Sequence, residues 1–251
     1  EDEFKMNKPD LVVVQGDTSS ALSGAISAFY NKIPVAHIEA GLRTKDKSNP
    51  YPEELNRRII SQIADLHFAP TKIAKENLKK SGITQNVYIT GNTVIDSLLL
   101  ISDSVKIPII KGLDFKNNKV ILLTVHRRAN WGDNLLSIAQ AVKMLAKEIK
   151  EISFLIPMHK NKIVRDKLLS ELSGVSNIFL TEPLNYEELI GSMKNCFLVL
   201  TDSGGLQEEA PTFGKPVLIL RDNTEREEAL HAGTSKLIGS ERTNIFKQVK
   251  P

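Results

Sequence analysis

The stretch "CFLVLTDSGGLQEEAPTFGKPVLIL", residues 196–220, decides the fold class. It begins with an apolar run of strand length, passes through a polar turn and a helical segment, and ends in a second apolar run. Two buried strands joined by a helix form a βαβ unit, and βαβ units build parallel sheets. In open parallel sheets, ligands bind at the carboxyl ends of the strands, which is where the "DSGG" turn lies.

The turn and the helix after it allow two interpretations. Ser203, Gly204 and Gly205 are small, so their backbone N–H groups could approach an anion closely, and Glu209 two turns further on could reach a pair of sugar hydroxyls. The plainer interpretation is an ordinary turn followed by a solvated helix face. The first interpretation predicts a phosphorylated ligand that carries hydroxyl groups.

The same alternation of apolar runs and helical patterns continues along the chain. Further strands are predicted at 10–15, 34–40, 66–70, 86–90, 119–125, 152–157 and 177–181. Strands rich in Val, Ile and Leu without polar alternation are typical of parallel sheets that are covered on both faces. The pattern predicts an α/β protein with two doubly wound, Rossmann-like domains.

The polar connection near residues 90–119 marks the expected domain boundary. We predict an N-terminal domain at 1–95, an interdomain connection at 96–118 and a C-terminal domain at 119–251, with a cleft between the domains. The chain begins in polar, helix-like sequence that runs directly into a buried strand. We therefore expect further sequence to precede it, so that the N-terminal domain is incomplete here.

Composition limits the functional classes. The chain has 251 residues, of which 41% are hydrophobic and 25% charged, and its net charge is +3. Lys and Arg are scattered among acids, so nucleic-acid binding is not predicted. No apolar stretch reaches the ~18 to 20 residues of a membrane span, and the single cysteine, Cys196, falls in a predicted buried strand. A cytoplasmic protein is therefore expected. A metal site is not predicted, because no histidine or cysteine pair has the spacing of metal ligands.

Polar residues gather at the predicted strand ends. Asp17, Glu39 and His126 each follow an apolar run, so they could converge in the cleft despite their separation in sequence. Each also has a structural explanation: Asp17 could cap the next helix, Glu39 could form an ion pair, and His126 could be a core histidine.

Further candidates lie on helices and at other strand ends. Glu53 and Arg57 are four residues apart on one helix face, so they could form either an i,i+4 pair or part of a site. Arg226 could meet a phosphate or simply begin a solvated helix, and His159 stands at another strand end.

Seven motifs resemble the UDP-N-acetylglucosamine 2-epimerase family, in order and over nearly the whole chain. They are "VVVQGDT", "HIEAGLRT", "PYPEELNR", "TGNTVID", "TVHRRANWG", "TDSGGLQEEAPTFGKPVLILRDNTER" and "HAGT". The resemblance implies a GT-B architecture and interconversion of UDP-GlcNAc and UDP-ManNAc for envelope polysaccharides. It implies no cofactor and no metal, and we expect a homodimer.

The resemblance also implies roles for individual residues. Ser203, Gly204 and Gly205 would bind the UDP phosphates with Arg226, Glu209 would bind the ribose hydroxyls, and His159, Leu184 and Leu189 would line the rest of the nucleotide pocket. The acid–base candidates are Asp17, Glu39, Glu53 and His126, with Arg57 beside them. In the family-like mechanism, UDP leaves C1 as C2 loses its proton, and UDP adds back after C2 is reprotonated.

This sequence departs from the family pattern in several places. The N-terminal phosphate-binding segment and the terminal helices are not in this sequence, Ala129 stands where the family usually has Glu, and Glu227 replaces the usual Pro. Three hypotheses remain open: an epimerase, a hydrolysing relative that releases ManNAc, and an inactive UDP-binding fragment. A GT-B glycosyltransferase is a weaker rival, because the acids suit proton transfer at C2 better.

Overall fold

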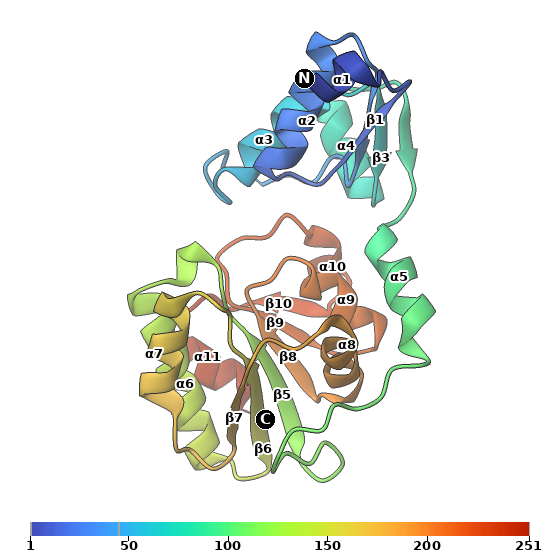
Figure 1. Ribbon diagram of the computed structural model, residues 1–251. Coiled ribbons are helices and arrows are strands. Elements are labelled where there is room, and N and C mark those ends of the chain that lie inside the picture. The colour runs from blue at the N-terminus through green and yellow to red at the C-terminus, as the bar shows by residue number, and fades with distance from the viewer. Residues whose placement is uncertain (1, 45, 251) are drawn as a thin grey trace. The chain divides into compact units, whose positions relative to one another are not determined.

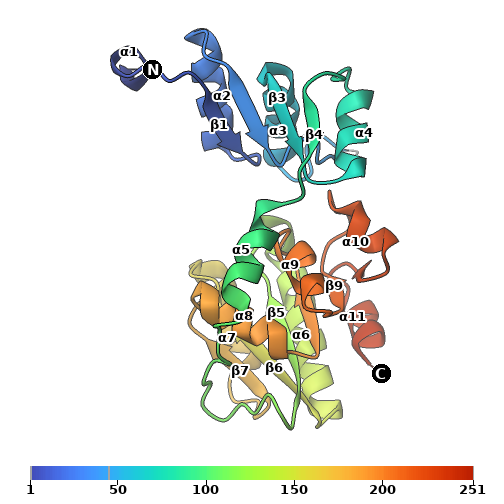
Figure 2. The same ribbon diagram turned by 90° about the vertical axis from the view of Figure 1, so that its right-hand side faces the viewer.

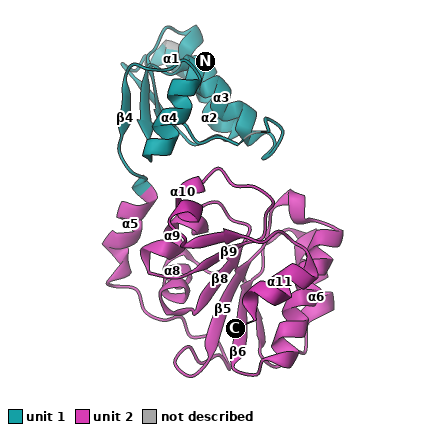
Figure 3. Cartoon of the chain, turned by 180° about the vertical axis from the view of Figure 1, so that it is seen from behind, with its two compact units in different colours: residues 1–93 teal, residues 94–251 magenta. Residues whose placement is uncertain are grey.

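The computed structural model describes residues 2–44 and 46–250. The chain divides into two compact units, unit 1 (residues 1–93) and unit 2 (residues 94–251) (Figure 3). Each unit holds one parallel sheet with helices on both faces (Figure 1). The predicted α/β class with two parallel sheets is therefore confirmed.

Unit 1 contains a four-stranded sheet in the order β1-β2-β3-β4 within the described residues. Its elements are α1 (Asp2–Met6), β1 (Val12–Gln15), α2 (Ser19–Tyr30), β2 (Val35–Ile38), α3 (Glu53–Ile63), β3 (Leu66–Ala69), α4 (Lys72–Lys80) and β4 (Val87–Ile89). Helices α2 and α3 pack against one face, where Ala21, Ala25 and Ala28 form a small-residue stripe on α2. Such residues let a helix lie close to the strands. On the other face Ala74 and Leu78 of α4 are buried.

Unit 2 contains a six-stranded sheet within the described residues. Its strands are β5 (Lys119–Thr124), β6 (Ile152–Pro157), β7 (Ile178–Thr181), β8 (Leu198–Thr201), β9 (Val217–Ile219) and β10 (Ser235–Leu237). Its helices are α5 (Thr93–Ser102), the short η1 (Arg128–Asn130), α6 (Asp133–Glu148), α7 (Lys162–Leu172), α8 (Tyr186–Asn195), α9 (Leu206–Thr212), α10 (Glu227–His231) and α11 (Arg242–Val249).

Strand β5 shows why the apolar runs lack polar alternation. Ile121 and Leu123 enter the core on the side of α6, α7 and α11, whereas Val120 and Leu122 enter the core on the side of α5, α8 and α9. Figures 1 and 2 show the two helical layers on opposite faces of this sheet. Successive side chains of a strand point to opposite faces, so a sheet covered on both sides needs apolar residues at every position.

The strand order of unit 2, β10-β9-β8-β5-β6-β7, places the functional loops. The chain builds outward from β5 to β7, then returns to the other side of β5 and builds outward from β8 to β10. The order reverses between β5 and β8, and this topological switch point is where doubly wound sheets bind ligands.

Two sequence expectations are wrong in detail. Strand β10, Ser235–Leu237, was not predicted, because it is short, lies at the end of the strand order and begins with two polar residues instead of an apolar run. Cys196 lies at the C-cap of α8 and not inside strand β8, although it is buried as expected. The domain boundaries at 95, 96–118 and 119 stay predictions. In the structure, Leu98 of α5 is buried in the core of unit 2.

Candidate functional site

The switch point of unit 2 brings together two loops that are far apart in sequence. Strands β5 and β8 pair with Thr124 opposite Thr201, and the hydroxyl oxygens of these two threonines are 2.6 Å apart. His126 follows β5, and Asp202 and Ser203 follow β8, so their positions at one sheet edge are a consequence of strand pairing.

A cavity of about 420 Å³ opens at this edge. Six of the residues that the sequence singled out line it: His126, His159, Leu184, Leu189, Ser203 and Glu209. They come from the loops after β5, β6, β7 and β8 and from helices α8 and α9. Leu206 and Met158 add to the apolar lining that Leu184 and Leu189 provide. A mostly apolar cavity with a few convergent polar groups is the usual form of a small-molecule site.

Glu209 is the unusual acid of this cavity. It is only 8% exposed, and its Oε2 atom has no hydrogen-bond partner among the described residues. Burial raises the pKa of its carboxyl, the nearby Glu208 raises it further, and Arg226 opposes them. A buried acceptor without a partner costs free energy, so it commonly marks a place where a ligand donates a hydrogen bond.

Arg226 lies directly over the Gly204 backbone. A Cβ atom at position 204 would come within 2.8 Å of the Arg226 Nη1 atom, so any larger residue there would displace the guanidinium. Arg226 pairs through Nη1 with Glu225 and through Nε with Oε1 of Glu208 at 2.7 Å. Gly205 is similarly tight, because a Cβ atom there would be 2.9 Å from Oε1 of Glu209. The two glycines therefore bring a cation and a carboxylate against the same turn.

The His126 ring lies beside a buried carboxylate, Asp202, which the sequence did not single out. The His126 Nδ1 atom is 3.3 Å from Oδ1 of Asp202, and the His126 ring stacks on that of His159 with centroids 5.6 Å apart. Burial lowers the pKa of His126, and Asp202 partly offsets this effect. The "TDSGG" motif contained Asp202, but nothing in one sequence distinguished it from a turn residue. His126 is thus held at the cavity wall and is not a core histidine.

Unit 1 carries a second polar cluster at the ends of its strands. Arg57, which is 3% exposed, pairs with the Asp17 carboxylate and, through Nη1, with Oε2 of Glu54 at 3.2 Å. Asn56 donates a hydrogen bond of 2.8 Å to the Asp17 carbonyl. Thr18, not Asp17, caps α2, accepting a hydrogen bond from the Ala21 N–H at 3.2 Å. The helix-cap explanation for the Asp17 side chain is therefore wrong.

Glu39 adopts an uncommon backbone conformation. Its φ is 64°, in the left-handed region that only a few per cent of non-glycine residues occupy. Its Oε2 lies 3.3 Å from where a Cβ of Gly16 would be, and its Oε1 accepts a hydrogen bond of 3.1 Å from Asn92. Residues held in such conformations cluster at functional sites. Glu39 thus extends over the turn that leads to Asp17.

The i,i+4 pair between Glu53 and Arg57 does not form. Arg57 pairs instead with Glu54, one residue later, whose carboxylate also accepts hydrogen bonds from Arg58 Nε at 2.7 Å and from the Thr44 N–H at 3.0 Å. Glu53 begins α3, and its carboxylate has no hydrogen bond or ion pair with any residue that the structure describes. Asp17 and Glu39 belong to unit 1 and His126 to unit 2, so the convergence of the three stays a prediction.

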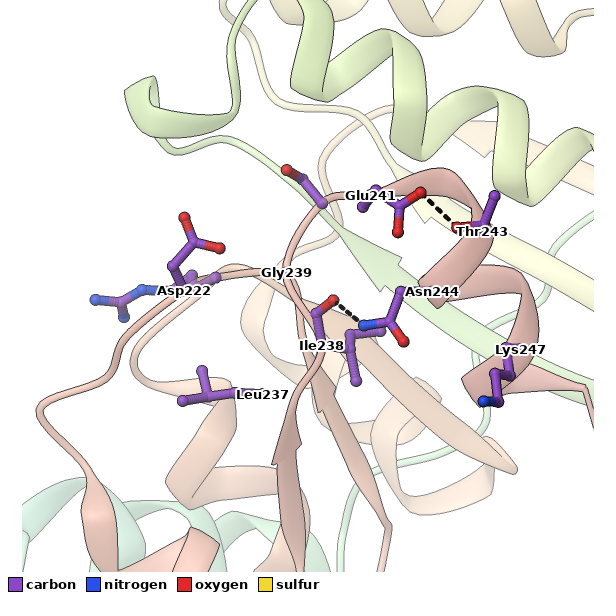
Figure 4. Close-up of a pocket in the computed structure, with 10 residues that line it drawn as sticks. Asp222, Leu237, Ile238, Gly239, Glu241, Thr243, Asn244 and Lys247 are labelled. Carbon is purple, nitrogen blue, oxygen red and sulfur yellow. Dashed lines mark hydrogen bonds between the residues drawn. The ribbon is translucent and has the colours of Figure 1, made fainter.

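A second cavity of about 590 Å³ lies beyond β9 and β10 and contains none of the predicted site residues. Figure 4 shows two hydrogen bonds among its lining residues: the Asn244 side chain donates to the Ile238 carbonyl at 2.7 Å, and the Thr243 hydroxyl donates to the Glu241 carboxylate. Because its lining mixes Asp222 and Glu241 with Lys247, it favours neither an anion nor a cation. The switch-point cavity is the better candidate.

Neither metal binding nor membrane spanning is supported within residues 2–44 and 46–250. No three histidine, cysteine, aspartate or glutamate side chains in these ranges are grouped as metal ligands. None of the helices there combines the length and the apolar character that crossing a bilayer requires.

Comparison with known proteins agrees with the geometry. A sequence profile described as UDP-N-acetylglucosamine 2-epimerase matches residues 1–251. Enzymes named UDP-N-acetylglucosamine 2-epimerase from Neisseria meningitidis and Bacillus subtilis are 48% and 43% identical; the matches cover 96% and 98% of this chain and 67% and 65% of those proteins. The chain thus spans about 65% of the length of several curated relatives it matches.

Solved structures agree in fold. A UDP-GlcNAc 2-epimerase from Neisseria meningitidis bound to UDP-GlcNAc has a TM-score of 0.94 at 46% identity, over 98% of this chain and 69% of that one. The enzyme from Methanocaldococcus jannaschii, in complex with UDP-GlcNAc and UDP, has a TM-score of 0.85 at 36% identity, over 99% and 70%. The α/β fold is thus of the GT-B class, and this chain belongs to the UDP-N-acetylglucosamine 2-epimerase family.

Proposed function

We propose that the chain binds UDP-N-acetylglucosamine and inverts its C2 centre to give UDP-N-acetylmannosamine. The observation that carries the proposal is Glu209: a buried carboxylate with an unpartnered oxygen, at the wall of a cavity at the switch point. A ribose offers two adjacent hydroxyl donors, which suit this acceptor. Leu184 and Leu189 supply apolar surface for the base, and the Ser203–Gly205 turn with Arg226 suits a diphosphate.

The proposed chemistry uses elimination followed by addition. A base removes the C2 proton while the C1–O bond breaks and its electrons leave with UDP, giving a 2-acetamidoglucal. An acid then returns a proton to the other face of C2, and the UDP oxygen adds back to C1. Because the proton leaves one face and returns to the other, two groups share the acid–base work. Arg226 and the turn amides stabilise the departing diphosphate.

In this proposal unit 1 supplies three of the four candidates for the proton transfer. Asp17 and Glu39 are the main candidates, because Arg57 orients the first carboxylate and a left-handed backbone presents the second over Gly16. Glu53, with no partner among the described residues, is a further candidate for acid–base work. His126 of unit 2 is the fourth. A homodimer and a role in envelope polysaccharide synthesis remain predictions of the resemblance. A cytoplasmic location and the expectation that nucleic acid and membrane are not partners remain predictions from composition.

The test is proton NMR of the chain with UDP-GlcNAc in D2O, with Asp17→Asn as the matched variant. We expect UDP-ManNAc carrying deuterium at C2 from the unaltered chain and no deuterium incorporation with the variant, while both bind UDP. Free ManNAc in place of UDP-ManNAc would replace the proposal with a hydrolysing enzyme. Saturable UDP binding without any exchange at C2 would reduce it to a nucleotide-binding chain.

A further inference from the structure

Asp202 is a carboxylate that is fully buried, at 0% exposure, at the end of β8. Its Oδ2 accepts hydrogen bonds from the His126 N–H at 3.0 Å, the Arg127 N–H at 2.9 Å and the Asn130 side-chain amide at 3.0 Å. Its Oδ1 accepts a longer one from the His126 N–H, at 3.1 Å, and faces the His126 ring. The two oxygens therefore have different neighbours.

The His126 ring is placed between this acid and the cavity. Its Nδ1 lies 3.3 Å from Oδ1 of Asp202, and within the described residues no other carboxylate is in ion-pair range of the ring. The ring also stacks on His159 and lines the cavity. With one nitrogen turned to the carboxylate, the other nitrogen, Nε2, is the one left to meet a ligand.

We propose that Asp202 is the positioning residue of His126: it keeps the proton on Nδ1, so that Nε2 presents a lone pair to the bound sugar nucleotide. A carboxylate beside one ring nitrogen sets both the tautomer and the orientation of an imidazole. This inference rests on the proposed function, in which His126 takes part in the reaction.

The charges around the ring make the tautomer, rather than the cation, the relevant state. Asp202 favours a protonated ring, whereas Arg127 and His159 oppose it. Burial, the largest effect, lowers the pKa of His126. The lowered pKa of His126 favours the neutral ring, and a neutral imidazole acts through whichever nitrogen lacks the proton.

The test is Asp202→Asn, and the structure predicts how the new amide will lie. The Asn oxygen will take the place of Oδ2, where three donors converge, so the amide N–H₂ will face His126 Nδ1. The ring must then accept at Nδ1 and carry its proton on Nε2. Nitrogen-15 NMR of the imidazoles, with His126→Asn identifying the signals, should show protonated Nδ1 in the unaltered chain and protonated Nε2 in the Asp202→Asn variant.

The kinetic readout is separate from the spectroscopic one. We expect Asp202→Asn to lower kcat by about a hundredfold or more and to change KM by less than about threefold, the pattern of lost acid–base function. Asn130→Ala is the matched control, because it removes one donor to Asp202 without touching the ring. It should lower stability and leave the His126 tautomer unchanged.

Three outcomes would overturn the inference. The first is an unaltered chain whose His126 carries its proton on Nε2. The second is an Asp202→Asn variant with an unchanged tautomer and rate. The third is a tautomer change in Asn130→Ala equal to that in Asp202→Asn, which would mean that the loop and not the carboxylate sets the ring. The NMR readout applies even to a chain that only binds UDP, so failure of the proposed function and failure of this inference can be told apart.

Discussion

Glu209 provides the sharpest test of the candidate site. We expect Glu209→Gln to weaken UDP binding, because the ribose would lose a charge-assisted acceptor while the overall shape of the side chain is kept. Hydrogen bonds to charged groups contribute about 1.5 to 3 kcal/mol each. Loss of one such bond corresponds to a roughly 10- to 150-fold increase in Kd.

Stability should move in the opposite direction. Burial and Glu208 raise the pKa of Glu209 in the folded chain, so the folded state holds the proton more tightly than the unfolded state does. The protonated carboxyl group therefore contributes stability at acidic pH, and this contribution is lost as the pH rises through the raised pKa and the group ionises. At pH 7 Glu209→Gln removes the cost of ionising a buried group, so without UDP the variant should melt at a higher temperature than the unaltered chain.

The assay is calorimetric titration at pH 7 with UDP and with 2′,3′-dideoxy-UDP, in both chains. If Glu209 binds the ribose hydroxyls, the dideoxy ligand should bind the unaltered chain more weakly than UDP does, and this difference between the two ligands should be smaller in the Glu209→Gln variant. Glu187→Gln is the matched control, because it removes the same charge from the exposed first turn of α8. The assignment would be refuted if the ratio of the two dissociation constants, for dideoxy-UDP and for UDP, were the same in the variant as in the unaltered chain.

Three further predictions concern other parts of the molecule. Gly204→Ala should weaken UDP binding, because its Cβ would collide with Arg226 Nη1, while calorimetry of Gly24→Ala, whose Cβ would meet nothing closer than 3.5 Å, should show unchanged affinity. Asp17→Asn should abolish turnover with UDP affinity intact and lower the free energy of unfolding by about 1 to 3 kcal/mol, because Arg57 loses a charged partner; a retained rate would exclude Asp17 from catalysis. Burial lowers the pKa of His37 from 6.5 to about 4, so the free energy of unfolding should fall by about 3 kcal/mol as the pH falls through this window, and His37→Gln should flatten that slope in urea titrations.

Local patterns in the sequence predicted most of the strands of the fold. Each apolar run predicted a strand because a doubly covered parallel sheet buries every side chain, as Val120 to Leu123 show. Strand β10 was missed because a short edge strand is not buried on all sides and therefore does not need an apolar run; its three residues include a lysine. Its partner β9, and not its own composition, makes it a strand.

For the candidate site, the sequence alone determined which residues stand at strand ends and which turn is small enough for an anion. Tertiary structure decided the partners. The sequence placed Glu53 and Arg57 at helical spacing, yet Arg57 pairs with Glu54 and with Asp17, because a residue forty positions away lies at the end of a neighbouring strand. Asp202 lies next to the His126 ring only because β8 pairs with β5. Spacing along one helix or turn is a local property that sequence records, whereas contacts between strand ends depend on the order of strands in the sheet, which pairing and burial across the whole unit determine.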